Sequence, residues 1–123
     1  MSPDRLPGVK EVIRQYSLRI DRSLGQHFLL DMNLAERIAK SAGNLAGITI
    51  YEVGPGPGTL TRALLKTDAP RIIGVERDER CVNALSDLLH ASGERLQLIT
   101  GDALKIDETD LAMTPCITIS NLP

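Results

Sequence analysis

The chain has 123 residues, 42% of them hydrophobic and 24% charged, a balance typical of one soluble globular domain and not of a disordered tail, a collagen-like repeat or a coiled coil. No apolar run could span a bilayer. The N-terminal segment mixes acids and bases without the apolar stretch of a signal peptide, so we expect a cytoplasmic protein with no membrane partner. The net charge of −2 does not indicate nucleic-acid binding by bulk charge.

Two amphipathic helices are predicted ahead of the first strand, at residues 9–17 and at about 32–42. Asp31 is placed to cap the second helix and Gly43 to end it. Between the helices, residues 18–30 show no steady period and predict an ordered loop. The apolar side chains expected to face the core are Val9, Ile13 and Tyr16 in the first helix, and Leu34, Ile38 and Ala42 in the second.

Further along the chain, short apolar strands alternate with helical segments. Strands are predicted at 48–53, 71–75, 96–100 and 116–120, and helices at 59–66 and 78–91. Asp78 is expected to cap the later helix. The inward positions are Leu60, Ala63 and Leu64 in the earlier helix, and Val82, Leu85 and Leu89 in the later one. This order predicts an α/β fold whose parallel sheet is covered on both faces.

The connections also predict the strand order. Right-handed crossovers place the second strand beside the first and the third beyond it, which gives the order 3-2-1-4. The gap between the first and fourth strands is then the switch point where such sheets bind ligands. The sequence ends at Pro123, three residues after the fourth predicted strand, whereas a doubly wound sheet normally continues. We therefore expect an incomplete sheet, the first half of a longer domain.

A glycine-rich loop follows the first predicted strand. Its sequence, EVGPGPGT from Glu52 to Thr59, opens a helix, and alternating glycines there allow a tight turn and close backbone approach to an anionic ligand. The dinucleotide fingerprint requires Gly or Ala at its sixth position, where this chain has Thr59. No Gly-Lys-Ser/Thr of a P-loop follows. The alternative is that the glycine-rich segment is a strand-to-helix turn with no ligand-binding role.

Acidic residues follow the next two predicted strands. Glu76 lies 76 − 54 = 22 positions after Gly54, where a carboxylate that accepts hydrogen bonds from ribose hydroxyls is expected. Asp102 follows the third strand and could accept a hydrogen bond from an adenine amine. The alternatives are a solvated strand-end charge for Glu76 and a simple Gly-Asp turn for Asp102.

The cysteines give no indication of a metal centre. Cys81 and Cys116 lie far apart in the sequence, and neither His27 nor His90 has metal-ligand spacing to them. We therefore expect two reduced thiols in a reducing compartment and no metal.

Taken together, three motifs resemble a known family. They are SLGQHFLLD from Ser23 to Asp31, EVGPGPGTLT from Glu52 to Thr61, and Asn121-Leu122-Pro123. With Glu76 and Asp102 in order between them, the chain resembles S-adenosylmethionine-dependent methyltransferases, and more narrowly the rRNA adenine N6-dimethyltransferases of the KsgA type. The resemblance covers about residues 20–123 and implies a Rossmann-like methyltransferase fold.

The resemblance implies a role for each matching residue. The cofactor S-adenosylmethionine would be held by His27, Leu29, Gly54, Glu76, Asp102 and Asn121. The methyl-transfer site would be formed by Asn121, Leu122 and Pro123. Adenine N6 is a poor nucleophile because its lone pair is delocalised into the ring. Carbonyl groups that accept its N–H hydrogens would localise that pair for in-line attack, so catalysis would be mostly positioning and electrostatics. The target base must be flipped out of its stack to reach the site.

The implied activity is methyl transfer to N6 of two adjacent adenosines of small-subunit rRNA during ribosome biogenesis, with the precursor of the small ribosomal subunit as partner. We expect a monomer. Residues 1–46 would form a helical extension that carries the N-terminal cofactor motif, and residues 47–123 the first half of the catalytic domain. We predict that the 123-residue chain is inactive, or nearly so, by itself.

Some positions depart from the family pattern. The family's Tyr after Asn-Leu-Pro, which would stack on the target base, has no counterpart before the sequence ends at Pro123. His27 stands where the family often has Asn. Arg19, Arg22 and Ser23 stand where it often has a Lys-rich stretch, which weakens the case for strong RNA contact by this segment.

Three alternatives remain open. The first is a resistance-type methylase that acts on large-subunit rRNA and shares these motifs. The second is a non-catalytic paralogue that binds RNA or ribosomes, against which the intact Asn121-Leu122-Pro123 argues. The third is a nicotinamide-dinucleotide domain, against which Thr59 argues.

Overall fold

The computed structural model describes residues 6–18, 31–102 and 116–120. Its centre is a four-stranded sheet in the order β3-β2-β1-β4, and all three strand pairs are parallel. The strands are β1 (Thr49–Val53), β2 (Arg71–Glu76), β3 (Leu96–Thr100) and β4 (Cys116–Ser120). The predicted α/β class, the parallel pairing and the strand order are confirmed, and the predicted strand ends are within one residue of those observed.

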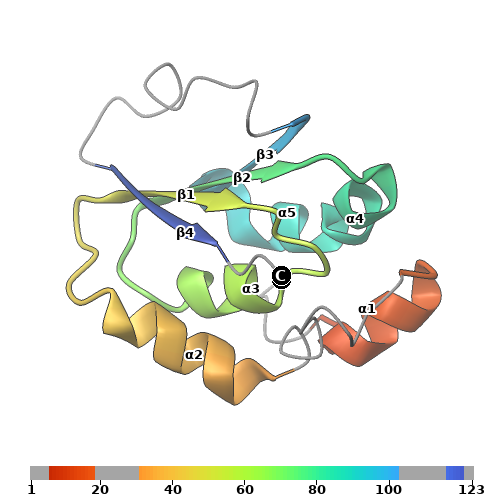
Figure 1. Ribbon diagram of the computed structural model, residues 1–123, viewed down its shortest axis with the longest axis horizontal. Coiled ribbons are helices and arrows are strands. Elements are labelled where there is room, and N and C mark those ends of the chain that lie inside the picture. The colour runs from red at the N-terminus through yellow and green to blue at the C-terminus, as the bar shows by residue number, and fades with distance from the viewer. Residues whose placement is uncertain (1–5, 19–30, 103–115, 121–123) are drawn as a thin grey trace.

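The described helices all lie on the same side of the sheet (Figure 1). They are α1 (Val9–Gln15), α2 (Met32–Ser41), α3 (Thr59–Leu65), α4 (Glu79–Ala84) and α5 (Ser86–Ser92), and a short 3-10 turn (Gly93–Arg95) leads into β3. The main core cluster joins buried residues of α2, α3 and α5 to Ile50 and Ile72. The opposite face of the sheet has a second cluster of Tyr51, Ile73 and Val75, to which none of these described helices contributes a residue.

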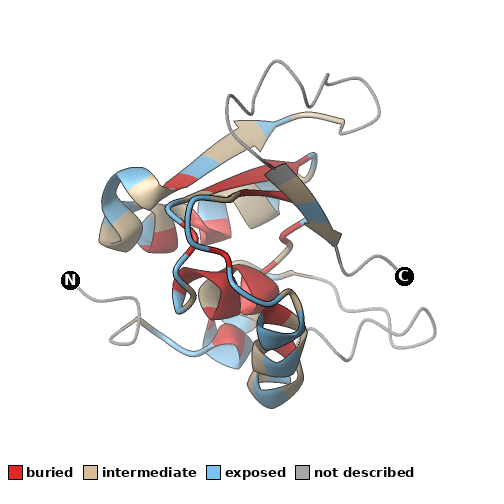
Figure 2. Cartoon of the chain, turned by 90° about the vertical axis from the view of Figure 1, so that its left-hand side faces the viewer, coloured by how far each residue is buried: buried red, intermediate tan, exposed pale blue. Residues whose placement is uncertain are grey.

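Helix α3 is the most enclosed helix of the described chain, as its colouring in Figure 2 shows. Six of its seven residues are buried, and Arg62 is the exception. The predicted inward residues Leu60, Ala63 and Leu64 are confirmed, with exposed fractions of 4%, 1% and 0%. A short helix with so little polar surface forms because it is packed between the sheet and its neighbouring helices, not through propensity alone.

The buried face of α2 differs from the one predicted. Asp31 caps the helix as expected, since its carboxylate accepts a hydrogen bond from the Leu34 amide at 3.1 Å. However, the buried residues are Ala35 and Ala39, while Leu34 is only half-buried. Helix α2 packs against α3, and small alanine side chains allow that close approach. Of the other predicted residues, Ile38 and Ala42 are half-buried against the core.

The single helix predicted for residues 78–91 is two helices that meet at Leu85. The Leu85 amide donates to both the Cys81 and the Val82 carbonyls, at 3.0 and 3.2 Å, so the last turn of α4 tightens toward 3-10 geometry. Leu85 is buried as predicted. Leu88 is also buried, whereas the predicted Val82 and Leu89 are half-buried.

Candidate functional site

The glycine loop makes a left-handed turn at the carboxyl end of β1. Gly54, Gly56 and Gly58 have φ values of +68°, +56° and +94°, which L-residues with a Cβ rarely adopt. The Gly54 amide donates to the Val75 carbonyl at 2.9 Å, and the Gly58 amide donates to the Pro55 carbonyl at 3.0 Å. The turn is therefore tied both to itself and to β2.

Gly58 in the loop and Gly74 in β2 also allow close packing, because a Cβ at either position would contact a neighbouring side chain. A Cβ on Gly58 would lie 2.8 Å from Cδ2 of Leu85, so α3 can begin close to the junction of α4 and α5. On β2, a Cβ at Gly74 would meet Leu98 Cδ2 at 3.1 Å and Pro55 Cγ at 3.3 Å. Gly74 was not predicted as part of the site, and a glycine inside a strand was the signal that could have identified it.

Glu76 ends β2 directly beside this loop. Its side chain is 7% exposed. One carboxylate oxygen accepts the Gly56 amide at 2.9 Å, and the other accepts the Asp78 amide at 3.0 Å. Each carboxylate oxygen has a further lone pair. Glu76 therefore holds the glycine loop in place while keeping acceptor capacity for another donor.

Glu52, near the end of β1, is a second carboxyl group beside the loop, and it was not predicted as part of the site. It is 2% exposed, and Thr61 Oγ donates to its Oε1 at 2.6 Å. Burial, with a smaller contribution from the charge of Glu76, raises the pKa of Glu52 to about 7 despite the Thr61 hydrogen bond. The hydrogen bond links the strand before the loop to the helix after it.

Three predicted site residues lie at one edge of the sheet. In register, Val53 pairs with Val75, and Glu76 pairs with Thr100, so Gly54, Glu76 and Asp102 follow or end three adjacent strands at the same carboxyl edge. The Gly101 amide donates to the Glu76 carbonyl at 2.9 Å, which ties the turn before Asp102 to β2. Asp102 itself is half-buried.

The other predicted site residues, His27, Leu29, Asn121, Leu122 and Pro123, lie outside the described part of the chain. Asp78 is a helix cap as predicted, since its side chain accepts from the Arg80 amide. Cys81 is a free thiol, and burial raises its pKa to about 12. The thiol therefore stays protonated at neutral pH and is a poor nucleophile.

This arrangement suits a ligand that combines a ribose with other polar groups. A buried carboxylate fixed by two backbone amides can accept hydroxyl hydrogens, and a glycine-lined turn admits close approach of a ligand. No described helix has the length and apolarity needed to cross a membrane. Within the same residue ranges, no group of three His, Cys, Asp or Glu side chains could hold a metal ion.

Comparison with known proteins identifies the family. The family profile of ribosomal RNA adenine dimethylase matches residues 17–123. A curated relative, ribosomal RNA small subunit methyltransferase A of Sinorhizobium medicae, is 48% identical over 120 residues. The alignment covers 98% of this chain and 44% of the relative, so the chain spans less than half of that protein's length.

Solved structures agree with the fold. The 23S rRNA methyltransferase ErmE is similar with a TM-score of 0.65 and 26% identity, over 76% of this chain and 36% of that protein. A dimethyladenosine transferase from Plasmodium falciparum shares the fold with a TM-score of 0.62 at 23% identity, over 76% of this chain and 32% of that one. Since the family profile matches most of the chain, the protein belongs to the ribosomal RNA adenine dimethylase family.

Proposed function

We propose that this chain contains the cofactor-binding part of an enzyme that methylates N6 of two adjacent adenosines in small-subunit rRNA, with S-adenosylmethionine as methyl donor. The observation that carries the proposal is the glycine loop fastened to Glu76 at the carboxyl edge of the sheet. Two relatives that share 48% and 50% sequence identity with this chain are named as small-subunit methyltransferases, which supports the choice of substrate. The enzyme would act as a monomer, in the cytoplasm, on the precursor of the small subunit.

The described residues would bind and orient the cofactor. Glu76 would accept hydrogen bonds from the ribose hydroxyls through its free lone pairs, and the Gly54 backbone would approach the amino-acid end. Asp102 would accept a hydrogen bond from the adenine amine. The bound cofactor supplies an electrophilic methyl group on a sulfonium. Glu52 acts indirectly, because its bond to Thr61 fixes the ends of the loop.

The remaining roles belong to residues of the two other motifs. His27 and Leu29, in the extension formed by residues 1–46, would complete the cofactor site. Asn121, with Leu122 and Pro123, would accept the N6 hydrogens of a flipped adenine, localising the nitrogen lone pair toward the methyl group. The proton released from N6 leaves to solvent. No metal is needed for this reaction.

A large-subunit methylase is the second candidate function, and the similarity to ErmE favours it. Its 26% identity is well below the 48% shared with the small-subunit relative, so the small subunit is the preferred substrate. Methylation assays on undermethylated small and large subunits, using a protein extended to the relatives' length, separate the two.

Calorimetric titration of this chain with S-adenosylmethionine, with NAD as control and circular dichroism to verify folding, tests the cofactor assignment. We expect saturable binding of S-adenosylmethionine and none of NAD. Binding of NAD alone, or a folded extended protein that binds neither, contradicts the proposal.

A further inference from the structure

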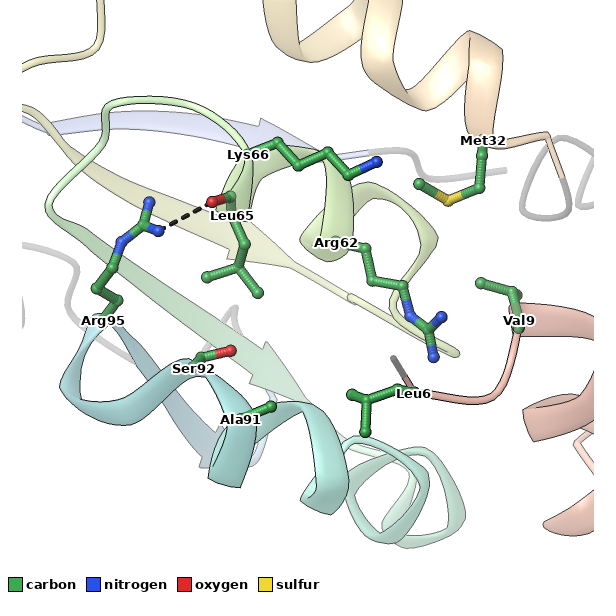
Figure 3. Close-up of a pocket in the computed structure, with 10 residues that line it drawn as sticks. Leu6, Val9, Met32, Arg62, Leu65, Lys66, Ala91, Ser92 and Arg95 are labelled. Atoms are coloured by element: carbon green, nitrogen blue, oxygen red, sulfur yellow. Dashed lines mark hydrogen bonds between the residues drawn. The ribbon is translucent and has the colours of Figure 1, made fainter. Parts of the chain in front are cut away.

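A cavity of about 590 Å³ lies among the described helices (Figure 3). It is open to solvent on one side and is lined by the segment leading into α1, the first turn of α2, one face of α3 and the end of α5. None of its described lining residues belongs to the loop 54–58, and neither Glu76 nor Asp102 lines it. The volume is in the range of small-molecule sites.

The walls of this cavity combine apolar side chains with cations. Leu6, Val9, Met32 and Leu65 supply apolar surface, and the charged side chains are Arg62, Lys66 and Arg95. No acidic residue is among the described lining residues. The cavity is therefore suited to a ligand that carries negative charge on an apolar body.

Two of the three cations already have partners. Arg95 donates to the carbonyls of Leu65, Thr67 and Ala69 at 2.9, 3.0 and 2.8 Å, and so it anchors the end of α3. The Lys66 ammonium lies 2.8 Å from a carboxylate oxygen of Glu36 on α2. Both groups have structural roles that the fold explains.

Arg62 differs from them. Its Nε is buried and finds no hydrogen-bond partner among the described residues. In Figure 3 its guanidinium reaches into the space between Leu6 and Val9. Burial lowers the pKa of this guanidinium, as expected for a charge taken from water without compensation. Arg62 is therefore a half-buried cation that lines a cavity and has no anionic partner among the described residues, an arrangement that favours binding of an anion there.

We infer that this cavity is an oxyanion site in which the Arg62 guanidinium binds a phosphate or carboxylate group that enters the cavity. Gly54, Glu76 and Asp102, the described residues of the proposed cofactor site, do not line this cavity, and Arg62 is not among the residues assigned to that site. The group could come from a free small anion or from the phosphodiester backbone of an RNA, and both present the same oxygens to Arg62.

The test is a titration of the isotopically labelled 123-residue chain with inorganic phosphate, followed in proton–nitrogen spectra that resolve the arginine Nε–H groups. We expect a saturable shift of the Arg62 Nε–H and of nearby amides, with sodium chloride at equal ionic strength as control. The absence of a saturable shift, or the same shift with chloride, overturns the inference.

Variants separate ligand binding from charge screening. Arg62→Gln should weaken phosphate binding on the order of tenfold or more, because one charge-assisted contact is lost. Arg62→Lys keeps the charge but lacks the planar guanidinium, so its affinity for phosphate should lie between those of the parent chain and of Arg62→Gln. Arg37→Gln, an exposed α2 position outside the cavity, should bind like the parent chain. Equal effects of the Arg62 and Arg37 variants contradict the inference.

A stability measurement distinguishes a ligand group from a structural one. Without ligand, Arg62→Met should not lower Tm, because it replaces an uncompensated half-buried cation with an apolar side chain. With phosphate, Tm should rise for the parent chain and not for the variant. A clear fall of Tm in ligand-free Arg62→Met would show that Arg62 supports the fold, and would overturn the assignment.

A short RNA oligonucleotide identifies the source of the oxyanion. If the oligonucleotide shifts the Arg62 Nε–H at lower concentration than phosphate does, the ligand is a phosphodiester. If phosphate or a small carboxylate is the better ligand, the source is a free anion. Either result supports the site, and failure of all probes rejects it while leaving the cofactor proposal intact.

Discussion

At the scale of single residues, two carboxyl groups below the glycine loop have different environments and therefore different properties. Both acceptor oxygens of Glu76 are oriented by backbone amides, and each keeps a lone pair that can accept a hydrogen bond from a hydroxyl. Glu52 has one hydroxyl donor, from Thr61, and is buried. The first is suited to binding a ligand, whereas the second is a structural link.

Replacing Glu76 tests its double role. Glu76→Gln places an amide NH₂ opposite a backbone N–H, either of Gly56 or of Asp78, and should lower the free energy of unfolding by about 1–2 kcal/mol. It should also weaken S-adenosylmethionine binding. Thermal unfolding and calorimetry measure the two effects separately. The control Glu79→Gln, on the exposed first turn of α4, should change stability by less than about 0.5 kcal/mol. Equal losses in both variants would contradict this role.

The raised pKa of Glu52 predicts a pH dependence of stability. Its folded pKa of about 7 lies above the reference value of 4.5, so between these values the folded state binds a proton that the unfolded state does not. The contribution to stability is fully present below pH 4.5 and is lost as the pH rises to about 7. At about 1.4 kcal/mol per pKa unit, the loss is on the order of 3 kcal/mol.

Glu52→Gln removes that titration while an amide oxygen still accepts the Thr61 hydroxyl. We expect the variant to be more stable than the parent chain at pH 8 and about equal to it near pH 4, in denaturant unfolding followed by circular dichroism. A variant that is less stable at both pH values would show that the carboxyl group itself, and not its charge, is required.

At the scale of elements, α3 illustrates how a turn and a helix depend on each other. Its N-terminal glycine combines a left-handed backbone with close contact to the neighbouring helices. Gly58 is therefore required for two reasons, its left-handed backbone and its close contact with Leu85. The two effects can be measured apart.

Gly58→Ala should be strongly destabilising. The left-handed backbone, φ +94°, costs an alanine about 1 kcal/mol, and the contact with Leu85 adds about 1–3 kcal/mol of overpacking. Gly43→Ala is the matched control, since Gly43 has φ +80° and a Cβ added there would meet no atom within 4 Å, so it should show only the backbone effect. Chemical denaturation measures both, and similar values for the two variants would contradict the packing argument.

At the scale of the whole molecule, the described sheet has β4 at one edge, paired only with β1 among the described strands. The chain spans 44% of the Sinorhizobium medicae relative. We therefore predict that this chain shows no turnover on undermethylated small subunits, whereas a protein extended to the relative's length does. Transfer of labelled methyl groups into rRNA measures this, and full turnover by the 123-residue chain would prove the prediction wrong.

Much of the fold was predictable because local signals agreed with one another. The capping residues Asp31 and Asp78 mark two helix starts correctly, and the short apolar strands have the predicted order. The buried face of α2 was not predictable, since hydrophobic periodicity favours burial of Leu34 over burial of the alanines. Ala35 and Ala39 are buried instead, because α2 lies close to α3 and small side chains fit between the two helices.

The same division holds for the candidate site. The glycine loop and the acids that follow β2 and β3 could be located from sequence alone, because a left-handed turn and a strand end depend on neighbours in the chain. Tertiary packing was needed to establish that Glu76 fastens Gly56, that Glu52 is buried against Thr61, and that Arg62 reaches a cavity with its buried Nε unpaired among the described residues. Hydrogen-bond partners and burial depend on residues distant in sequence, and packing alone brings them together.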